Sequence, residues 1–201
     1  MLSIKQLSID ELKPLYESRL KEDFPPNELR PYDSIIQLLK QDRYITLAYK
    51  AEEIMAYAFF IKRPENNTVL LDYYAVSKDS RGTGIGGEFI SRFHEIFTPM
   101  GVDHILIEVE CLKTAKNQEE ADVRSRRIHF YEKNGCRMSH VRSWVFGVDY
   151  SIMYLPFDSK VREDRMLSDE LEGMYRVIVP PLLKKGVDFD SVVKFWIEDE
   201  V

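Results

Sequence analysis

The chain has 201 residues, of which 44% are hydrophobic and 31% are charged, and its formal net charge is −6. This length and mixture of charges indicate a folded globular protein, and the acidic balance argues against nucleic-acid binding, which needs a basic surface. The longest apolar run covers only residues 56–61, well short of the ~20 residues that span a bilayer. We therefore expect neither a nucleic-acid partner nor a membrane segment.

The first part of the chain is predicted to begin with helices. Residues 5–24 indicate a helix capped by Ser8 or Asp10, in which Pro14 is tolerable only in or close to the first turn. The run Phe24-Pro25-Pro26-Asn27 would end it, and a shorter helix is expected over residues 34–41. Three strand-like runs then predict an antiparallel meander. They cover residues 44–50, 54–62 and 68–76, with turns at residues 51–52 and 66–67.

The pattern then changes to alternating helices and strands. The connection between the strands at residues 68–76 and 104–111 is long enough for a right-handed parallel crossover, so we expect an α/β (or α+β) fold. Its central sheet would be mixed and mostly antiparallel, with helices on both faces. Three further helices are predicted at residues 84–97, 168–177 and 190–197, and another helix is predicted to end at residues 134–135. Residues 137–146 and 149–155 are predicted to form a hairpin that turns at residues 147–148.

Two parts of the chain differ in character. We expect residues 1–156 to form the main domain and residues 157–201 to form a helical extension. Its apolar residues Val192, Val193, Phe195 and Trp196 need a surface to bury against. That surface would be the main domain, or else the extension would serve as a lid or a homodimer contact.

The turn after the third strand carries the clearest chemical signal. Residues 77–81 are polar, and Gly82, Gly84, Gly86 and Gly87 follow at the start of a helix. Such a turn presents unpaired backbone N–H groups to an anion, and glycine lets the backbone approach phosphate oxygens closely. Arg81 adds a charged fork suited to a pyrophosphate. The segment therefore predicts a phosphate-binding turn.

Two cofactors fit these glycines. The spacing Gly82-x-Gly84-x-x-Gly87 matches the dinucleotide fingerprint, and Glu108 or Glu110 lies where a ribose-binding acid is expected. Five polar residues, 77–81, separate the glycines from the strand, however, and three strands precede it, which is unusual for an NAD site. A glycine-rich turn without any ligand is the third alternative.

The same segment, written Arg81-x-x-Gly84-x-Gly86, resembles the cofactor motif of the GNAT-type N-acetyltransferase superfamily. The run from Phe130 through Tyr131 to Gly135 resembles the family's helix that ends in Tyr-x-x-x-Gly. The likeness covers about residues 1–156. It implies a GNAT-like acyl-CoA acyltransferase fold with a V-shaped splay between two parallel strands. It also implies acetyl-CoA as the donor and transfer of the acetyl group to a primary amine.

The resemblance implies roles for individual residues. Backbone groups of Tyr74, Ala75 and Val76 would pair with the pantetheine arm, with the Val76 N–H facing the thioester carbonyl. Tyr131 would protonate the departing thiolate, although a core aromatic is the alternative for this residue. The pyrophosphate would be held by the turn, which comprises Arg81, Gly82, Thr83, Gly84, Ile85, Gly86 and Gly87.

A general base is also expected, because an alkylamine with a pKa near ~10.4 is mostly protonated at neutral pH. Glu108 and Glu110 share one face of the strand at residues 104–111, opposite its apolar face. Asp72 on the neighbouring strand is a third candidate. Paired structural carboxylates are an equally good interpretation of all three residues.

One departure from the family concerns the helix before the tyrosine. Many relatives have Asn and Ala where this chain has Arg124 and Arg127. These arginines could meet the 3′-phosphate or the adenine of CoA, or they could form a solvated face that balances Glu119 and Glu120. Cys136 also stands where relatives often have Phe, which affects local packing only.

The acceptor is open between a small-molecule amine and a peptide amine. In relatives, the first two helices and the last hairpin shape the acceptor site, so residues 24–27, Tyr32, Trp144 and Tyr150 are candidate walls. No histidine or cysteine spacing indicates a metal site, and Cys111 and Cys136 are expected to be buried thiols of a cytoplasmic protein. A catalytically silent CoA-binding module and an NAD-binding oxidoreductase remain alternatives to the transferase.

Overall fold

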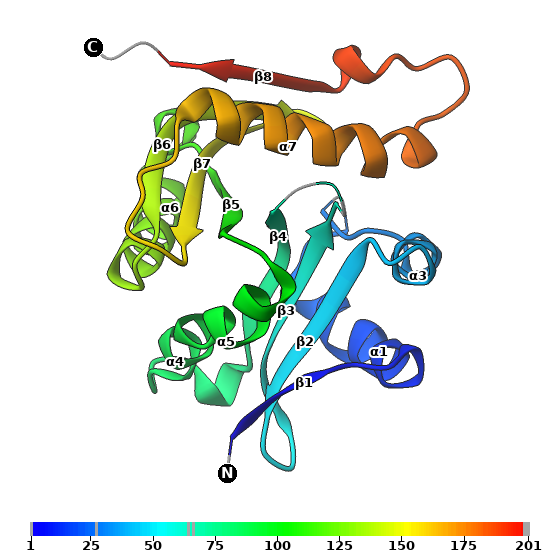
Figure 1. Cartoon of the computed structure of the whole chain (residues 1–201), viewed down its shortest axis with the longest axis vertical. Coiled ribbons are helices and arrows are strands. Elements are labelled where there is room, and N and C mark those ends of the chain that lie inside the picture. The colour runs from blue at the N-terminus through cyan, green and yellow to red at the C-terminus, as the bar shows by residue number, and fades with distance from the viewer. Residues whose placement is uncertain (1, 27, 64, 66, 199–201) are drawn as a thin grey trace. The chain divides into compact units, whose positions relative to one another are not determined.

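The computed structural model describes residues 2–26, 28–63, 65 and 67–198. Its strands form an eight-stranded mixed sheet in the order β1-β2-β3-β4-β5-β7-β6-β8, with a parallel pair (Figure 1). The predicted fold class, a mixed sheet with helices, is confirmed. The chain divides into two compact units, Met1–Pro64 with Leu71–Phe93 and Glu65–Leu70 with His94–Val201. The splay between parallel strands and the boundary near residue 156 stay predictions.

Three of the first four strands have the bounds predicted for the meander. Two of them are nearly continuous buried apolar runs, which explains why the pattern predicted them at their observed bounds. Asn27 and Asn66, which were expected in the stop after the first helix and in a turn, lie outside the described residues. The strands are β1 Ser3–Gln6, β2 Tyr44–Lys50, β3 Ile54–Lys62 and β4 Thr68–Val76, of which β1 and β2, and β2 and β3, pair antiparallel.

The N-terminal helix prediction was wrong at its start. Residues 5 and 6, predicted as its first residues, belong instead to β1, because β1 pairs along β2. Pro14 lies in the second turn of α1, close to the first turn as expected, and a π-helix follows directly. A proline has no N–H for the helical ladder, so a widened turn beside it is physically expected. Ser8 is confirmed as the cap. The helices are α1 Ile9–Leu15, the π-helix Tyr16–Leu20, α2 Lys21–Asp23 and α3 Tyr32–Lys40.

The second half of the chain matches the predicted alternation of helix and strand. The long predicted helix at residues 84–97 is two helices, and the hairpin turns at Phe146 and Gly147, both of which have positive φ. Strand β7 pairs antiparallel with both β5 and β6. The elements are α4 Ile85–Ser91, α5 Phe93–Phe97, β5 His104–Glu110, α6 Gln118–Lys133, β6 Arg137–Val145, β7 Val148–Pro156, α7 Asp164–Ile178 and β8 Val193–Ile197.

The prediction of a helix over residues 190–197 was wrong. Residues 193–197 form β8, which pairs antiparallel with β6 from Val145↔Val193 to Val141↔Ile197. The unpaired N–H and C=O groups on the edge of β6 decide the outcome, because an edge strand is a template for another strand. Helix α7 is longer than predicted and runs alongside β8 (Figure 1).

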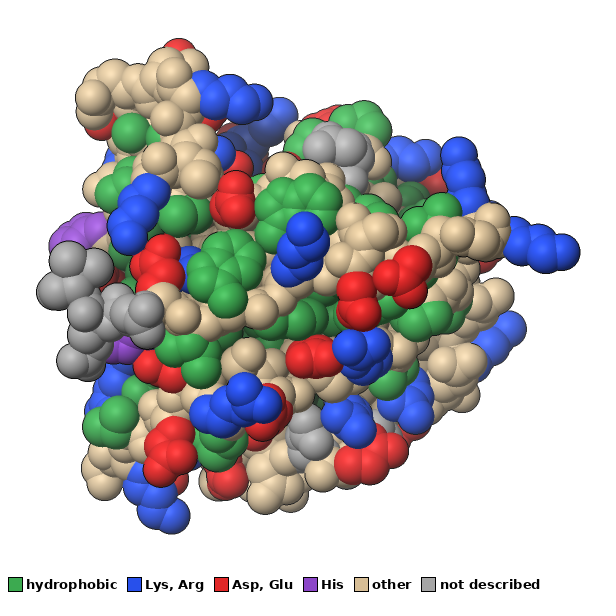
Figure 2. Space-filling model, turned by 90° about the horizontal axis from the view of Figure 1, so that it is seen from above, with side chains coloured by type: hydrophobic (Ala, Val, Ile, Leu, Met, Phe, Trp, Pro, Cys, Tyr) green, Lys and Arg blue, Asp and Glu red, His purple; other side chains and the backbone are tan. Residues whose placement is uncertain are grey.

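The side chains on the face seen in Figure 2 are of mixed kind. Lysine and arginine side chains are interspersed with aspartate and glutamate, and hydrophobic side chains occur between them in small groups. Alternating charges of this kind give no extended field of one sign on the viewed face.

Candidate active site

The predicted site residues fall into two groups, one in each unit. In the first unit, β4 ends at Val76 and a short 3₁₀ turn leads into the glycines. Gly82 and Gly84 have φ of +77° and +90°, a region that other residues rarely adopt. Within the described chain, no backbone carbonyl accepts a hydrogen bond from the N–H groups of residues 82–87. Six consecutive donors at a helix start are therefore available to an anion.

Arg81 holds this turn against the rest of its unit. Its Nε donates to the carbonyl oxygen of Val76 at 3.1 Å, and its Nη2 donates to Oδ1 of Asp23 at 3.2 Å. The Asp23 side chain is buried, and its Oδ2 accepts from Tyr57 Oη at 2.9 Å. The Arg81 side chain remains 56% exposed, so the guanidinium both fixes the turn and faces solvent.

Asp72, one of three candidate bases, is part of a largely buried ion pair. Nε and Nη2 of Arg30 lie 3.3 and 3.4 Å from its two carboxylate oxygens, and the Tyr44 hydroxyl also donates to it. The Asp72 and Arg30 side chains are only 15% and 9% exposed. Burial, followed by the Asp72 charge, raises the pKa of Tyr44 well above its ordinary value, so this hydroxyl keeps its proton. Three donor groups thus converge on the Asp72 carboxylate.

In the second unit, Glu110 is bound by Arg124 and Arg127 of α6, the two arginines that the sequence analysis considered as CoA ligands. Nη2 of Arg124 and Nη1 of Arg127 each lie 3.2 Å from one of its carboxylate oxygens. Arg124 also donates to the Cys111 carbonyl at 2.6 Å and is only 10% exposed, whereas Arg127 is 49% exposed. Two guanidinium groups compensate the charge of this carboxylate.

Glu108 is contacted by hydroxyl groups. Ser143 Oγ on β6 donates to its Oε1 at 2.9 Å, and the Tyr175 hydroxyl on α7 donates to its Oε2 at 2.5 Å. The side chains alternate along β5 as predicted, with Glu108 and Glu110 half-buried between fully buried neighbours. The structure therefore gives the two glutamates of one face different partners.

Tyr131 is buried at the end of α6, with 7% of its surface exposed. Burial raises the pKa of its phenol above the ordinary value, the Arg127 charge opposes the rise, and Cys136 adds to it. The Cys136 N–H donates to the Tyr131 carbonyl at 3.0 Å, which fixes the helix end. A phenol in this environment carries its proton at neutral pH.

The predicted acceptor residues are spread over several elements. Tyr32 lines a pocket of about 640 Å³ between α1 and α3 together with Asp10, Glu17 and Asp33. Trp144 and Tyr150 lie on the hairpin strands β6 and β7. The described residues contain no cluster of three potential metal ligands. None of the described helices is both long and apolar enough to cross a bilayer.

The glycine turn and the tyrosine at the end of α6 lie within one family match. Residues 9–136 match the family model described as the acetyltransferase (GNAT) family. The chain belongs to the GNAT acetyltransferase family. The resemblance that the two motifs carried is thereby confirmed.

Individual relatives of this GNAT chain are distant. It is 30% identical over 119 residues to the candidate acetyltransferase YjbC of Bacillus subtilis (strain 168). These residues are 57% of this chain and 53% of YjbC, so the chain spans about half the length of that relative. The ribosomal-protein-S18-alanine N-acetyltransferase of Escherichia coli superposes with a TM-score of 0.58 at 19% identity, over 81% of this chain and 98% of the other. A Bacillus subtilis acetyltransferase in complex with CoA superposes with a TM-score of 0.53 at 18% identity. The match covers 79% of this chain and 100% of the other.

Several contacts of this GNAT chain escaped prediction from sequence. Asp23, Arg30, Ser143 and Tyr175 all bind predicted site residues. The run Leu167, Leu171, Met174 and Ile178 does mark the buried face of α7, and Tyr175 lies beside it. A buried hydroxyl group needs a hydrogen-bond partner, but the local sequence pattern does not predict that this partner lies on β5.

Proposed function

We propose that this protein is an N-acetyltransferase that moves the acetyl group of acetyl-CoA to a primary amine. The observation that carries the proposal is the row of unpaired N–H groups at residues 82–87, which follows β4 and begins α4. Donors in such a row, at the positive end of a helix, suit a pyrophosphate. A Cβ at Gly82 or Gly84 would meet no atom within 4 Å, so there is open space for a ligand.

The chain's own residues divide the chemistry between them. Acetyl-CoA, as substrate, supplies the acetyl group as a thioester. The turn from Arg81 to Gly87 holds its phosphates, and the backbone of Tyr74, Ala75 and Val76 pairs with its pantetheine arm. The amine nitrogen forms a bond to the carbonyl carbon, the C–S bond breaks, and Tyr131 gives its proton to the leaving thiolate.

Among the three carboxylates, we assign the general base to Glu108. Asp72 and Glu110 are each bound by guanidinium groups, which only donate hydrogen bonds and cannot accept one from a protonated carboxyl group. The Ser143 and Tyr175 hydroxyls that contact Glu108 can donate to a carboxylate and accept from a carboxylic acid. Glu108 would therefore take the amine proton, directly or through water.

We assign different roles to the two α6 arginines. Arg124 is nearly buried and makes three contacts with β5 and its following turn, so it holds the end of β5. Arg127 is half-exposed, so its guanidinium can also meet the 3′-phosphate of CoA. Several family neighbours support an amine acceptor, since their names include N-acetyltransferases of a ribosomal-protein alanine and of spermidine.

The proposal is tested by thiol release from acetyl-CoA across a panel of polyamines, amino acids and peptide N-termini. Release that requires an amine supports the transferase. Release with none of the amines, combined with thermal stabilisation by CoA, would instead favour a catalytically silent CoA-binding module.

Thermal shift separates CoA from NAD. A ligand at about 100 times its Kd adds about 2.7 kcal/mol of stability, which raises Tm by several degrees in a protein of this size. We expect this rise with acetyl-CoA and not with NADH. The opposite result would overturn the proposed cofactor.

A further inference from the structure

The carboxylate of Glu108 is contacted by a residue from the C-terminal part of the chain. The Tyr175 hydroxyl on α7 donates to Oε2 at 2.5 Å, while Ser143 Oγ on β6 donates to Oε1 at 2.9 Å. Tyr175 is 7% exposed and Ser143 is fully buried. Each carboxylate oxygen thus has a buried hydroxyl donor, and the two donors come from different elements.

The Tyr175 side chain is held in place by the elements around it. Helix α7 packs on β6 and β8, and its Leu167, Leu171 and Met174 side chains are fully buried. The Tyr175 ring also lies 5.6 Å, centroid to centroid, from the ring of Phe195 on β8. Burial of the ring and its contact with Phe195 restrict its rotamers, so the position of its hydroxyl is fixed by the fold.

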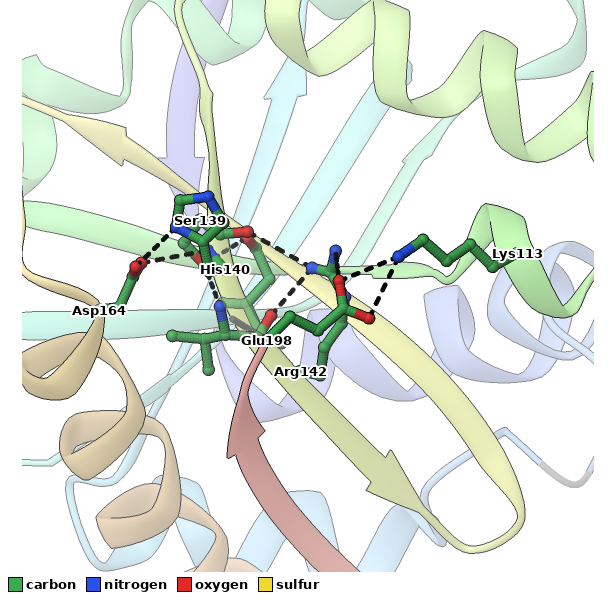
Figure 3. Close-up of polar contacts among 8 residues, drawn as sticks. Lys113, Ser139, His140, Arg142, Asp164 and Glu198 are labelled. Atoms are coloured by element: carbon green, nitrogen blue, oxygen red, sulfur yellow. Dashed lines mark hydrogen bonds and ion pairs between the residues drawn. The ribbon is translucent and has the colours of Figure 1, made fainter. Parts of the chain in front are cut away.

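Polar contacts anchor both ends of this C-terminal segment to β6 (Figure 3). At the start of α7, Oδ1 of Asp164 accepts from the His140 N–H at 3.1 Å and its Oδ2 lies 2.9 Å from His140 Nδ1. After β8, Glu198 is bound by Arg142 at 2.9 Å and by Lys113 at 3.2 Å. The segment that carries Tyr175 is therefore built into its unit at two separate points.

Hydroxyl partners suit a carboxylate that must change its protonation state. A hydroxyl donates to the ionised form and can turn to accept from the neutral form, whereas a guanidinium only donates. Glu110, two residues away on the same face of β5, has guanidinium partners and illustrates the contrast. The same strand thus carries one carboxylate with two guanidinium donors and one that accepts from two hydroxyl groups.

We propose that Tyr175 is a positioning residue for Glu108, so that the C-terminal segment is part of the active site. The inference rests on the proposed function, in which Glu108 is the base. Tyr175 touches no reacting atom; it orients the carboxylate and stabilises its ionised form. Ser143 shares this task on the other oxygen.

The decisive variant is Tyr175→Phe, which removes one oxygen and keeps the packed ring. Tyr154→Phe is the matched control, because Tyr154 is also buried in the same unit and its hydroxyl accepts from the Arg162 N–H at 3.4 Å. In Tyr175→Phe we expect kcat to fall roughly 10- to 100-fold, with KM for acetyl-CoA unchanged. The acid limb of the kcat/KM profile should move up by about 1–2 pH units, because the ionised base has lost a donor. Tyr154→Phe should keep the wild-type profile.

A second measurement is independent of turnover. The ¹³C-carboxyl signal of Glu108, assigned by its loss in Glu108→Gln, is titrated in the wild-type protein and both tyrosine variants. We expect the midpoint to rise in Tyr175→Phe only. An unmoved midpoint, or an unmoved rate profile, would overturn the positioning role. If the wild-type protein acetylates no amine, the proposed function fails, and the titration still decides whether Tyr175 stabilises the Glu108 carboxylate.

Discussion

Nη2 of Arg81 donates to Oδ1 of Asp23 at 3.2 Å, which joins the end of α2 to the glycine-rich turn 58 residues later. The same carboxylate accepts from the Tyr57 hydroxyl and lies 3.7 Å from Arg19 Nε. A single acidic side chain, 6% exposed, thus connects the glycine-rich turn with a helix and with β3. The turn is therefore held from outside as well as by its own glycines.

This relationship predicts the effect of Asp23→Ala. Buried donors left without an acceptor cost about 1–3 kcal/mol each, so the variant should lose stability in urea unfolding. Its affinity for CoA, measured by calorimetry, should fall because Arg81 is released. Glu22→Ala is the control, since Glu22 forms an exposed pair with Lys78; equal losses of CoA affinity in both variants would contradict the role of Asp23.

The glycine conformation gives a second prediction. Gly84 has a φ of +90° and Gly101 a φ of +76°, and a Cβ at either position would meet no atom within 4 Å. Alanine at either position should therefore cost about 1–2 kcal/mol of folding free energy through backbone strain alone. Only Gly84→Ala should weaken CoA binding in a thermal-shift titration. A similar loss of CoA binding in Gly101→Ala would mean that backbone strain, rather than damage to the proposed phosphate site, explains the effect.

The two α6 arginines can be told apart with two ligands. Arg127→Ala should weaken binding of CoA but leave binding of dephospho-CoA unchanged, because only CoA has the 3′-phosphate. Arg124→Ala should lower Tm more than Arg127→Ala does, because Arg124 is nearly buried and makes more contacts. If Arg127→Ala weakens both ligands equally, or neither of them, the 3′-phosphate contact is wrong.

The sequence predicted the elements well where the chain itself determined them. The strands β2, β3 and β4 were found at their observed bounds because apolar residues fill them and turn residues bound β2 and β3. Short edge strands were missed. Residues 3–6 and 193–197 are too short for a clear period, and in each case a partner strand elsewhere decides the conformation.

The candidate site also combines features that the local sequence predicts with features that depend on distant residues. The glycines, Tyr131 and the shared face of Glu108 and Glu110 follow from local patterns. The difference between the two glutamates does not, because it comes from Tyr175, 67 residues away in sequence, and from α6 arginines 14 and 17 residues away. Partner identity is a property of the fold, so the choice of base became possible only with the structure.

Tyr131→Phe tests the proposal that Tyr131 is the acid that protonates the leaving thiolate. The variant should lower kcat with acetyl-CoA while leaving CoA affinity unchanged, since the ring remains packed. Because burial raises the pKa of the phenol, Tyr131 stays protonated in the wild-type protein beyond its ordinary pKa near ~10. The wild-type rate should therefore not fall between pH 8 and about 10 through ionisation of Tyr131. An unchanged kcat in the variant would remove Tyr131 from this role.

Cys136 gives a prediction about alkaline stability. Burial raises the pKa of its thiol from 9.0 to about 12, so the folded protein binds this proton more tightly than the unfolded chain does. The resulting contribution to stability is fully present below pH 9 and is lost as the pH rises from 9 towards 12.

We expect the free energy of unfolding of the wild-type protein, relative to Cys136→Ala, to be constant up to about pH 8. Above pH 9 the difference should fall by about 1.4 kcal/mol per pH unit, as measured by urea unfolding at closely spaced pH values. The other ionisable groups are present in both proteins, so their titrations largely cancel in the difference. Parallel stability curves up to pH 10.5 would show that the thiol ionises as easily in the folded protein as in the unfolded chain.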